Sequence, residues 1–234
     1  MPQNLLILGG TTEASSLAHL ISKTEFNATI SYAGRVERIR QQPIQNRMGG
    51  FGGVEGLASY IATNGITHLV DATHPFAAQM SQNAILACQK TNIPLAALTR
   101  PQWQKQKADN WHLVSDIKAA AAALDGDPKR VMLAIGRMHL AQFYNNLQHF
   151  YLLRLVDRPE VPPAFPNQVI EVSRGPFTTA QDTLLLSNYE IDLIVAKNAG
   201  GKAAYAKIEA ARQLEIKVIM IERPVISDRL TFYN

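Results

Sequence analysis

The sequence predicts an α/β fold of two Rossmann-like halves, each with a mainly parallel sheet, and a cleft between them. Two observations support this fold class. Apolar runs alternate with helical patterns along the chain, and most runs are apolar throughout rather than at every second position. Strands of that composition are buried in parallel sheets that helices cover on both faces. The expected strands are residues 4–8, 28–32, 67–71, 95–98, 131–135, 150–155, 169–172, 193–196 and 217–221.

Helical patterns, with apolar residues three and four positions apart, lie between many of these strands. They span residues 13–23, 54–64, 77–90, 117–124, 138–146, 178–187 and 203–214. So many strands would make one large sheet, and the polar stretch 125–129 is the best break between two halves. We therefore expect an N-terminal domain over residues 1–126 and a C-terminal α/β domain over residues 127–234.

The composition indicates a folded chain without membrane segments. Of 234 residues, 47% are hydrophobic and 18% are charged, which argues against disorder. No apolar run approaches the roughly 20 residues of a membrane span, and no basic region precedes the first run as in a signal peptide. With one cysteine, Cys88, we expect a cytoplasmic protein. The net charge of +4 does not require nucleic acid but suits an anionic small ligand.

A glycine turn links the first strand to the first helix. Gly9 and Gly10 follow the apolar run, and Thr11 and Thr12 open the helical pattern. Glycines let a backbone approach a phosphate, which the helix N–H groups and dipole then attract. The spacing is not that of the G-x-G-x-x-G fingerprint, and Glu13 in the first turn would repel a phosphate. A dinucleotide site is therefore one interpretation, and a plain strand-to-helix turn is the other.

Two further features indicate which dinucleotide would bind. NAD enzymes place an acid roughly 20 residues after the glycine turn, whereas an arginine accommodates the 2′-phosphate of NADP. Here the acid is missing, and Ser31 and Arg35 are available. Gly50, Phe51 and Gly52 then lie in a run of four glycines in five residues, whose entropic cost favours a backbone lying against a flat ligand. A flexible loop is the alternative.

Residues 71–77 are the most informative stretch of the chain. Asp71, Thr73 and His74 directly follow a buried strand, and Phe76 precedes a helical pattern. Ligands of α/β proteins bind at the carboxyl ends of strands, so these side chains predict a site. An unperturbed imidazole titrates around pH 6.5, which makes His74 a candidate proton donor; Asp71 would orient it or cap the next helix. An ordinary strand-to-helix turn is the alternative.

The second half repeats this logic with a basic turn. Lys197, Asn198, Gly200 and Gly201 lie between a strand and a helix, although the spacing is not that of a P-loop. They predict a site for a carboxylate or phosphate, and Arg174 adds a guanidinium suited to bidentate carboxylate binding. The spacing of the six histidines predicts no metal site, and no G-x-S-x-G elbow indicates serine acyl transfer.

Together these segments resemble the precorrin-6A reductase family of cobalamin biosynthesis. The resemblance spans nearly the whole chain, with its motifs in the family's order. They are residues 9–14, 33–36, 49–53, 71–77, 100–103, 174–177 and 197–201. Ala199 departs from the pattern, since the family commonly has serine there, and the residues after Pro224 match no part of it.

The resemblance implies NADPH-dependent reduction of one double bond in the precorrin-6A or cobalt-precorrin-6A macrocycle, giving precorrin-6B or its cobalt form. The N-terminal domain would bind the cofactor, and the C-terminal domain would contribute to the site of the anionic tetrapyrrole. The expected catalytic residues are His74, Asp71 and Lys197, with Lys197 and water as rival proton donors to His74. The expected cofactor-binding residues are Gly9, Gly10, Thr11, Thr12, Ser31, Arg35, Gly50, Phe51, Gly52 and Thr73. The expected substrate-binding residues are Phe76, Arg174, Lys197, Asn198, Gly200 and Gly201. Any cobalt would arrive with the substrate, so no protein metal site is expected.

Two other functions are compatible with parts of the pattern. One is a different NADP-dependent reductase or epimerase on a Rossmann scaffold, because fold does not determine function. The Tyr-x-x-x-Lys pair of the short-chain class is absent. The other is a non-enzymatic nucleotide-binding sensor, which would need neither the polar residues at 71–76 nor the basic turn at 197–202. Nothing in the sequence indicates the oligomeric state.

Overall fold

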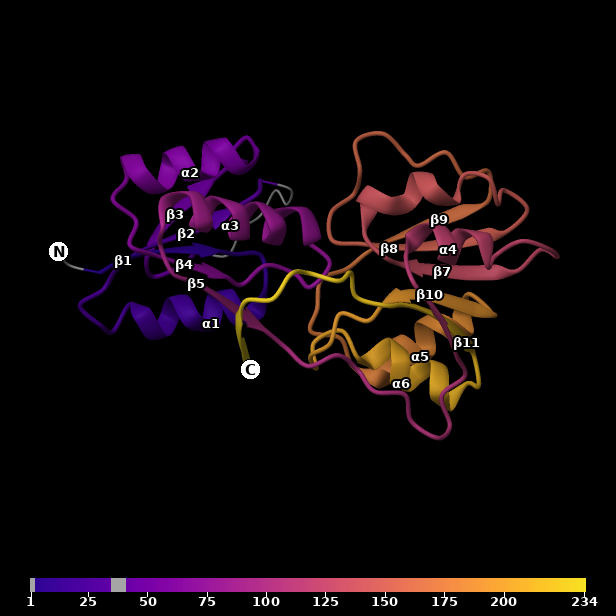
Figure 1. The fold of residues 1–234 in the computed structure, drawn as a ribbon. Helices are drawn as coiled ribbons and strands as arrows, with labels where there is room; N and C mark the ends of the chain where they lie inside the picture. Colours follow the sequence, from indigo (N-terminus) through magenta and orange to yellow (C-terminus); the bar gives the residue numbers. More distant parts are fainter. Residues whose placement is uncertain (1–2, 35–40) are drawn as a thin grey trace. The chain divides into compact units, whose positions relative to one another are not determined.

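The computed structural model describes residues 3–34 and 41–234 and divides the chain into two compact units (Figure 1). The N-terminal unit is Met1–Pro101 together with Val225–Asn234, and the C-terminal unit is Gln102–Pro224. The expected boundary at residue 126 differs from this division. Residues 111–114 form a strand of the second sheet, so the polar stretch 125–129 is a turn inside the C-terminal unit.

The N-terminal unit is built on a six-stranded parallel sheet with the order β12-β5-β4-β1-β2-β3. Its strands are β1 (Asn4–Leu8), β2 (Asn27–Tyr32), β3 (Gln45–Met48), β4 (His68–Asp71), β5 (Leu95–Thr99) and β12 (Leu230–Tyr233). Its helices are α1 (Thr12–Ile21), α2 (Gly53–Thr63) and α3 (Ala78–Thr91). In Figure 1, α2 and α3 cover one face and α1 covers the other.

The alternating residues of β1 explain why this sheet has two buried faces. Leu6 and Leu8 pack with Leu57 of α2 and Ala84 of α3, whereas Ile7 points the other way. Ile7 packs with the small and apolar residues of α1. Successive side chains of a strand leave opposite faces of the sheet, so an apolar residue is required at every position. This is the physical basis of the continuous apolar runs.

The C-terminal unit has a second six-stranded parallel sheet, with the order β6-β11-β10-β7-β8-β9. Its strands are β6 (Trp111–Val114), β7 (Arg130–Ala134), β8 (Phe150–Leu155), β9 (Gln168–Val172), β10 (Leu193–Lys197) and β11 (Lys217–Ile221). Its helices are α4 (Ile117–Ala122), the 3₁₀ helix η1 (Arg137–Phe143), α5 (Thr179–Asn188) and α6 (Ala206–Gln213). Side chains of α5 and α6 pack on one face of this sheet around Met132 and Ile194.

The predicted α/β fold with parallel sheets is confirmed, and each expected strand is present to within one residue at either end. Three short strands were not expected: β3, β6 and β12. Each lies at an edge of its sheet and has exposed positions, so it lacks a continuous apolar run. Within the described residues, no helix is both long and apolar enough to cross a bilayer. The cleft between the halves stays a prediction.

Candidate active site

The candidate site of the N-terminal unit lies where the sheet changes direction between β1 and β4. Leu8 of β1 is aligned with Asp71 of β4, so the glycine turn and residues 72–76 leave the sheet side by side. The hydroxyl of Thr11 donates a 2.7 Å hydrogen bond to the carbonyl of Ala72 and accepts one of 3.1 Å from the N–H of Ala14. Thr11 thus caps α1 and ties the two predicted segments together. In open α/β sheets this is the crevice that binds ligands.

The two glycines of the first turn do different work. A Cβ on Gly9 would lie 2.9 Å from a side-chain carbon of Ile30, so the turn packs directly on β2. Gly10 has φ +117°, a conformation that side chains rarely adopt, and a Cβ there would meet no atom within 4 Å. The space above Gly10 therefore suits a ligand that approaches the backbone.

Glu13 does not leave an unbalanced charge in this turn. Its carboxylate is buried and lies 2.9 Å from the guanidinium of Arg100. Burial by itself would raise the pKa of Glu13, but its own backbone N–H and the Arg100 guanidinium outweigh burial and lower the pKa. Thr12 adds a 3.2 Å hydrogen bond to the same carboxylate. The repulsion expected between Glu13 and a phosphate is therefore offset by Arg100.

Asp71 is a buried anchor rather than a partner of His74. Its side chain is 1% exposed. Oδ1 accepts hydrogen bonds from the N–H of Thr73 (3.1 Å) and its hydroxyl (2.6 Å). Oδ2 accepts from the Ser81 hydroxyl of α3 (2.6 Å) and from the guanidinium of Arg229. Of the two roles considered for Asp71, these contacts favour tethering the turn to α3 over orienting His74.

His74 is half-buried at the tip of the turn. Its Nδ1 accepts a 3.2 Å hydrogen bond from the N–H of Phe76, and the two rings are 5.8 Å apart. The proton of the neutral ring therefore lies on Nε2. Protonating Nδ1 would break the hydrogen bond to Phe76. The arrangement makes His74 a hydrogen-bond donor through Nε2 more readily than an acid.

The glycine run 49–53 is held in place by an arginine that the sequence analysis did not assign to the site. The guanidinium of Arg47 donates to the carbonyls of Gly49 (2.5 Å) and Gly50 (2.9 Å) and to the Ser31 hydroxyl (3.1 Å). It also lies 3.8 Å from the centre of the Phe51 ring. Gly52 has φ +81° and precedes α2. The run is an ordered loop beside the end of β2, not a flexible linker.

Arg35, the residue expected at the 2′-phosphate, lies outside the described residues. Ser31, its expected neighbour in the site, is 4% exposed, and its hydroxyl is bonded to Arg47. A guanidinium is therefore present at the end of β2, as expected, but it is supplied by Arg47 at the carboxyl end of β3. The signal for Arg47 was its position just before the glycine run.

In the C-terminal unit, Lys197 lies at the corresponding point of the second sheet, where β10 adjoins β7. Its Nζ donates a 2.8 Å hydrogen bond to the carbonyl of Ile135, just beyond β7. Burial lowers the pKa of the Lys197 ammonium to about 8. An amine that titrates this close to neutrality can both carry a positive charge and release a proton.

The turn after Lys197 is held by residues distant in sequence. The Asn198 side chain accepts from the N–H of Trp103 (2.8 Å) and donates to its carbonyl (3.1 Å). The indole N–H of Trp103 donates to the Gly201 carbonyl (2.8 Å), and Arg223 donates to the Asn198 and Ala199 carbonyls. These contacts place Asn198 and the buried Trp103 in the framework of the turn. Gly200 and Gly201, with φ +72° and +73°, shape its backbone.

Arg174 lies beyond β9, in the same unit, and its guanidinium is 3.5 Å from the carboxylate of Asp157. The Arg174 side chain is 40% exposed, so a ligand carboxylate can reach it, in competition with Asp157. Among the described residues, no group of three or more His, Cys, Asp or Glu side chains is placed to hold a metal ion.

Comparisons with known proteins agree with one another. The sequence profile of the family described as Precorrin-6x reductase CbiJ/CobK matches residues 4–234. A precorrin-6A reductase of Rhodobacter capsulatus is 52% identical over 225 residues, covering 96% of this chain and 90% of the relative. A cobalt-precorrin-6A reductase of Priestia megaterium is 30% identical, covering 95% and 91%. The solved structure titled CobK precorrin-6A reductase superposes with a TM-score of 0.93 at 51% identity, covering 98% of this chain and 91% of that one.

Proposed function

The chain belongs to the precorrin-6x reductase family, and we propose that it reduces one carbon–carbon double bond of precorrin-6A with a hydride from NADPH. The hydride adds to one carbon and a proton to its neighbour, which gives precorrin-6B and NADP⁺. The observation that carries the proposal is the convergence of the glycine turn and residues 72–76 at the change of direction of the first sheet.

The metal-free macrocycle is the substrate that the relatives favour. Identity is 52% and 47% to precorrin-6A reductases of Rhodobacter capsulatus and a Sinorhizobium, but 30% to the cobalt-precorrin-6A reductase of Priestia megaterium. Family membership also favours this activity over the other NADP-dependent reductases, the epimerases and the sensor considered from the sequence.

The residues of the first turn fit a dinucleotide phosphate. Helix α1 begins there with a capped N-terminus, open space lies above Gly10, and Arg100 balances Glu13. Backbone N–H groups at such a terminus attract phosphate. We assign the diphosphate to residues 9–12 and the 2′-phosphate to Arg47, with Arg35. The dinucleotide supplies the hydride, and the chain's task is to hold it in line with its acceptor.

The loop at Gly50, Phe51 and Gly52 and the turn at Thr73 would complete the cofactor site. Gly50 has open space where a Cβ would be, which lets the backbone lie close to a flat ligand. The Phe51 ring is packed under Arg47 and beside Tyr60, so it supports the loop instead of standing open to a ligand. Thr73 contributes through its backbone, because its hydroxyl is bonded to Asp71.

Lys197 is the proton donor that the geometry supports best. Its lowered pKa keeps a large fraction of the amine protonated at neutral pH while making the proton transferable. The Nδ1 of His74 is committed to the N–H of Phe76. We therefore assign His74 and Phe76 to substrate contact, Asp71 to positioning the turn, and Lys197 to proton transfer.

The macrocycle carries several carboxylates, and the C-terminal unit supplies cations and backbone N–H groups for them. Lys197, Arg174 and the backbone of Gly200 and Gly201 are the assigned contacts. Asn198 acts indirectly, by holding the turn through Trp103.

Anaerobic incubation of the protein with NADPH and precorrin-6A tests the proposal. We expect the nicotinamide and tetrapyrrole absorbances to change together, with one NADPH consumed for each macrocycle. Parallel reactions with NADH and with the cobalt form of the substrate test the two finer assignments. Nicotinamide oxidation without any change in the macrocycle would contradict the proposed reaction.

A further inference from the structure

The C-terminal tail contributes a strand to the N-terminal unit. Strand β12 pairs in parallel with β5, from Leu230 opposite Ala96 to Tyr233 opposite Thr99. It forms the edge of the sheet, two strands away from β4. The tail is the part of the chain for which the sequence indicated no role.

The residue before this strand reaches the candidate active site. Arg229 pairs with Asp71, 158 positions earlier in the chain, and the two side chains are 14% and 1% exposed. Strand β5 lies between them, and its residue aligned with Asp71 is Ala97, fully buried. The small side chain of Ala97 leaves room for the guanidinium on this face of the sheet.

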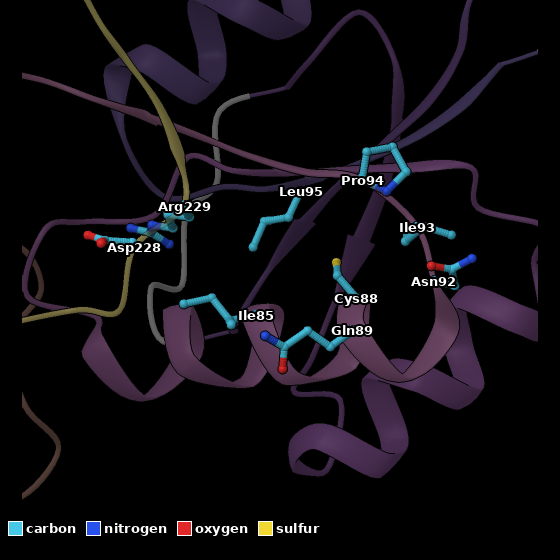
Figure 2. A pocket seen from close by; sticks show the side chains of 9 residues that line it. All are labelled: Ile85, Cys88, Gln89, Asn92, Ile93, Pro94, Leu95, Asp228 and Arg229. Carbon is cyan, nitrogen blue, oxygen red and sulfur yellow. The ribbon is translucent and has the colours of Figure 1, made fainter.

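Figure 2 shows Arg229 at one end of a pocket of about 510 Å³ between α3 and the start of β5. Its neighbour Asp228 is exposed, and the Asp228 carboxylate is directed away from the centre of the pocket. The two adjacent residues therefore differ: one side chain is committed to the buried carboxylate and the other is turned to solvent.

The ion pair is connected to the backbone of the site. A buried carboxylate is costly unless it is paired, and Arg229 supplies the charge that Asp71 needs. With Oδ2 held by Arg229 and Ser81, Oδ1 is aimed at the N–H and hydroxyl of Thr73. The carbonyl of the next residue, His74, accepts a 2.7 Å hydrogen bond from the N–H of Ala77. A displacement of Asp71 would therefore pass directly to Thr73 and His74.

We propose that Arg229 is a positioning residue of the active site: the tail fixes Asp71, and through it the turn that carries Thr73 and His74. The inference rests on the proposed function for its kinetic consequence, but not for its structural one. A misplacement of about 1 Å at a reacting centre costs up to about a hundredfold in rate.

Arg229→Met tests the proposal, with Asp228→Asn as the matched control and Arg229→Lys as the conservative variant. We expect Arg229→Met to lower kcat for precorrin-6A about 10- to 100-fold at a temperature where circular dichroism shows the fold intact. Arg229→Lys should recover much of the loss, and Asp228→Asn should match the wild type. In the Asp71→Asn background, Arg229→Met should have little further effect, because both act through one contact.

Amide hydrogen exchange gives a readout that does not need turnover. Arg229→Met should speed exchange of residues 72–77 but not of β10 and β11 in the other unit. If Arg229→Met does not fold, Arg229→Lys and Asp71→Asn carry the same test. A folded Arg229→Met protein with wild-type kcat and wild-type exchange at 72–77 overturns the proposal. A wild-type protein without turnover instead overturns the proposed function, and the exchange result then decides the positioning role alone.

Discussion

The two units use the same sheet order for different purposes. In each, five strands follow the order of a dinucleotide-binding sheet, and a sixth edge strand comes from elsewhere: β12 from the chain's end, and β6 from the segment ahead of β7. After β1 the chain makes a glycine turn and enters an α-helix capped by Thr11. After β7 it passes through Gly136 into the 3₁₀ helix η1, which has no side-chain cap.

This difference separates the two kinds of ligand. A capped α-helix presents aligned N–H groups and a dipole to a phosphate, so the first unit suits the cofactor. At the equivalent place the second unit presents the ammonium of Lys197, held by the Ile135 carbonyl. A lysine suits a carboxylate-bearing substrate and can also donate a proton. The comparison teaches that strand order locates a site, while the residues that leave the strands determine its chemistry.

The largest expected effect concerns proton donation. Lys197→Met should lower kcat about 10²- to 10⁴-fold while leaving NADPH affinity unchanged, because the cofactor is assigned to the other unit. Steady-state kinetics and a direct NADPH titration measure the two effects. The exposed Lys217→Met, at the amino end of β11, is the control. In the wild type, kcat should fall as the pH rises through about 8, since protonated Lys197 is lost. If His74→Ala instead abolishes the pH dependence, the assignment of the two residues is reversed.

A second prediction tests whether the first unit recognises the 2′-phosphate. Arg47→Ala should weaken NADPH binding about 10- to 100-fold and NADH binding far less, because a charged hydrogen bond contributes roughly 1.5–3 kcal/mol. Arg35→Ala should act in the same direction. Arg130→Ala removes an arginine that also lies over an aromatic ring, Phe150, but in the other unit, and should change neither affinity. Equal losses of NADPH and NADH binding would contradict a role at the 2′-phosphate.

A third prediction concerns the stability cost of Lys197. Burial lowers the folded-state pKa to about 8 from an ordinary value of 10.5, so the unfolded chain binds more protons between these pH values. Wild-type stability should therefore rise with pH across this window. Lys197→Met should be more stable than the wild type at pH 7 by roughly 1–3 kcal/mol, with the difference shrinking above pH 8. Urea unfolding of both proteins at several pH values measures this, and a constant difference would rule out the titration of Lys197 as its cause.

The smallest expected effect separates ligand contact from folding in the glycine run. Gly50→Ala adds a methyl group where no atom lies within 4 Å, so its free energy of unfolding should change by no more than about 0.5 kcal/mol. NADPH affinity should nevertheless fall severalfold if the backbone lies against the cofactor. Gly56→Ala is the counterpart, because its Cβ would overlap the Phe51 carbonyl and destabilise the unit. Unchanged NADPH affinity in Gly50→Ala would move the cofactor away from this loop.

The fold was largely readable from local pattern. Strands buried on both faces need apolar residues at every position, and this left a continuous signal for each central strand. The edge strands β3 and β12 carry polar or exposed residues, so their pairing depends on neighbours far away in the chain. The boundary between the units failed for the same reason: β6 belongs with β11, about a hundred residues later.

The sequence by itself determined the class of fold, the two turns that carry the candidate site and the family. Glycines, hydroxyls, a histidine and a lysine at strand ends are local features, and a chain can be searched for them. Only the tertiary structure decided which groups are engaged with one another. Asp71 is committed to Arg229, Asn198 to Trp103, and Glu13 to Arg100. These partners lie 87 to 158 positions apart, and their pairing depends on sheet register and burial, which no local pattern records.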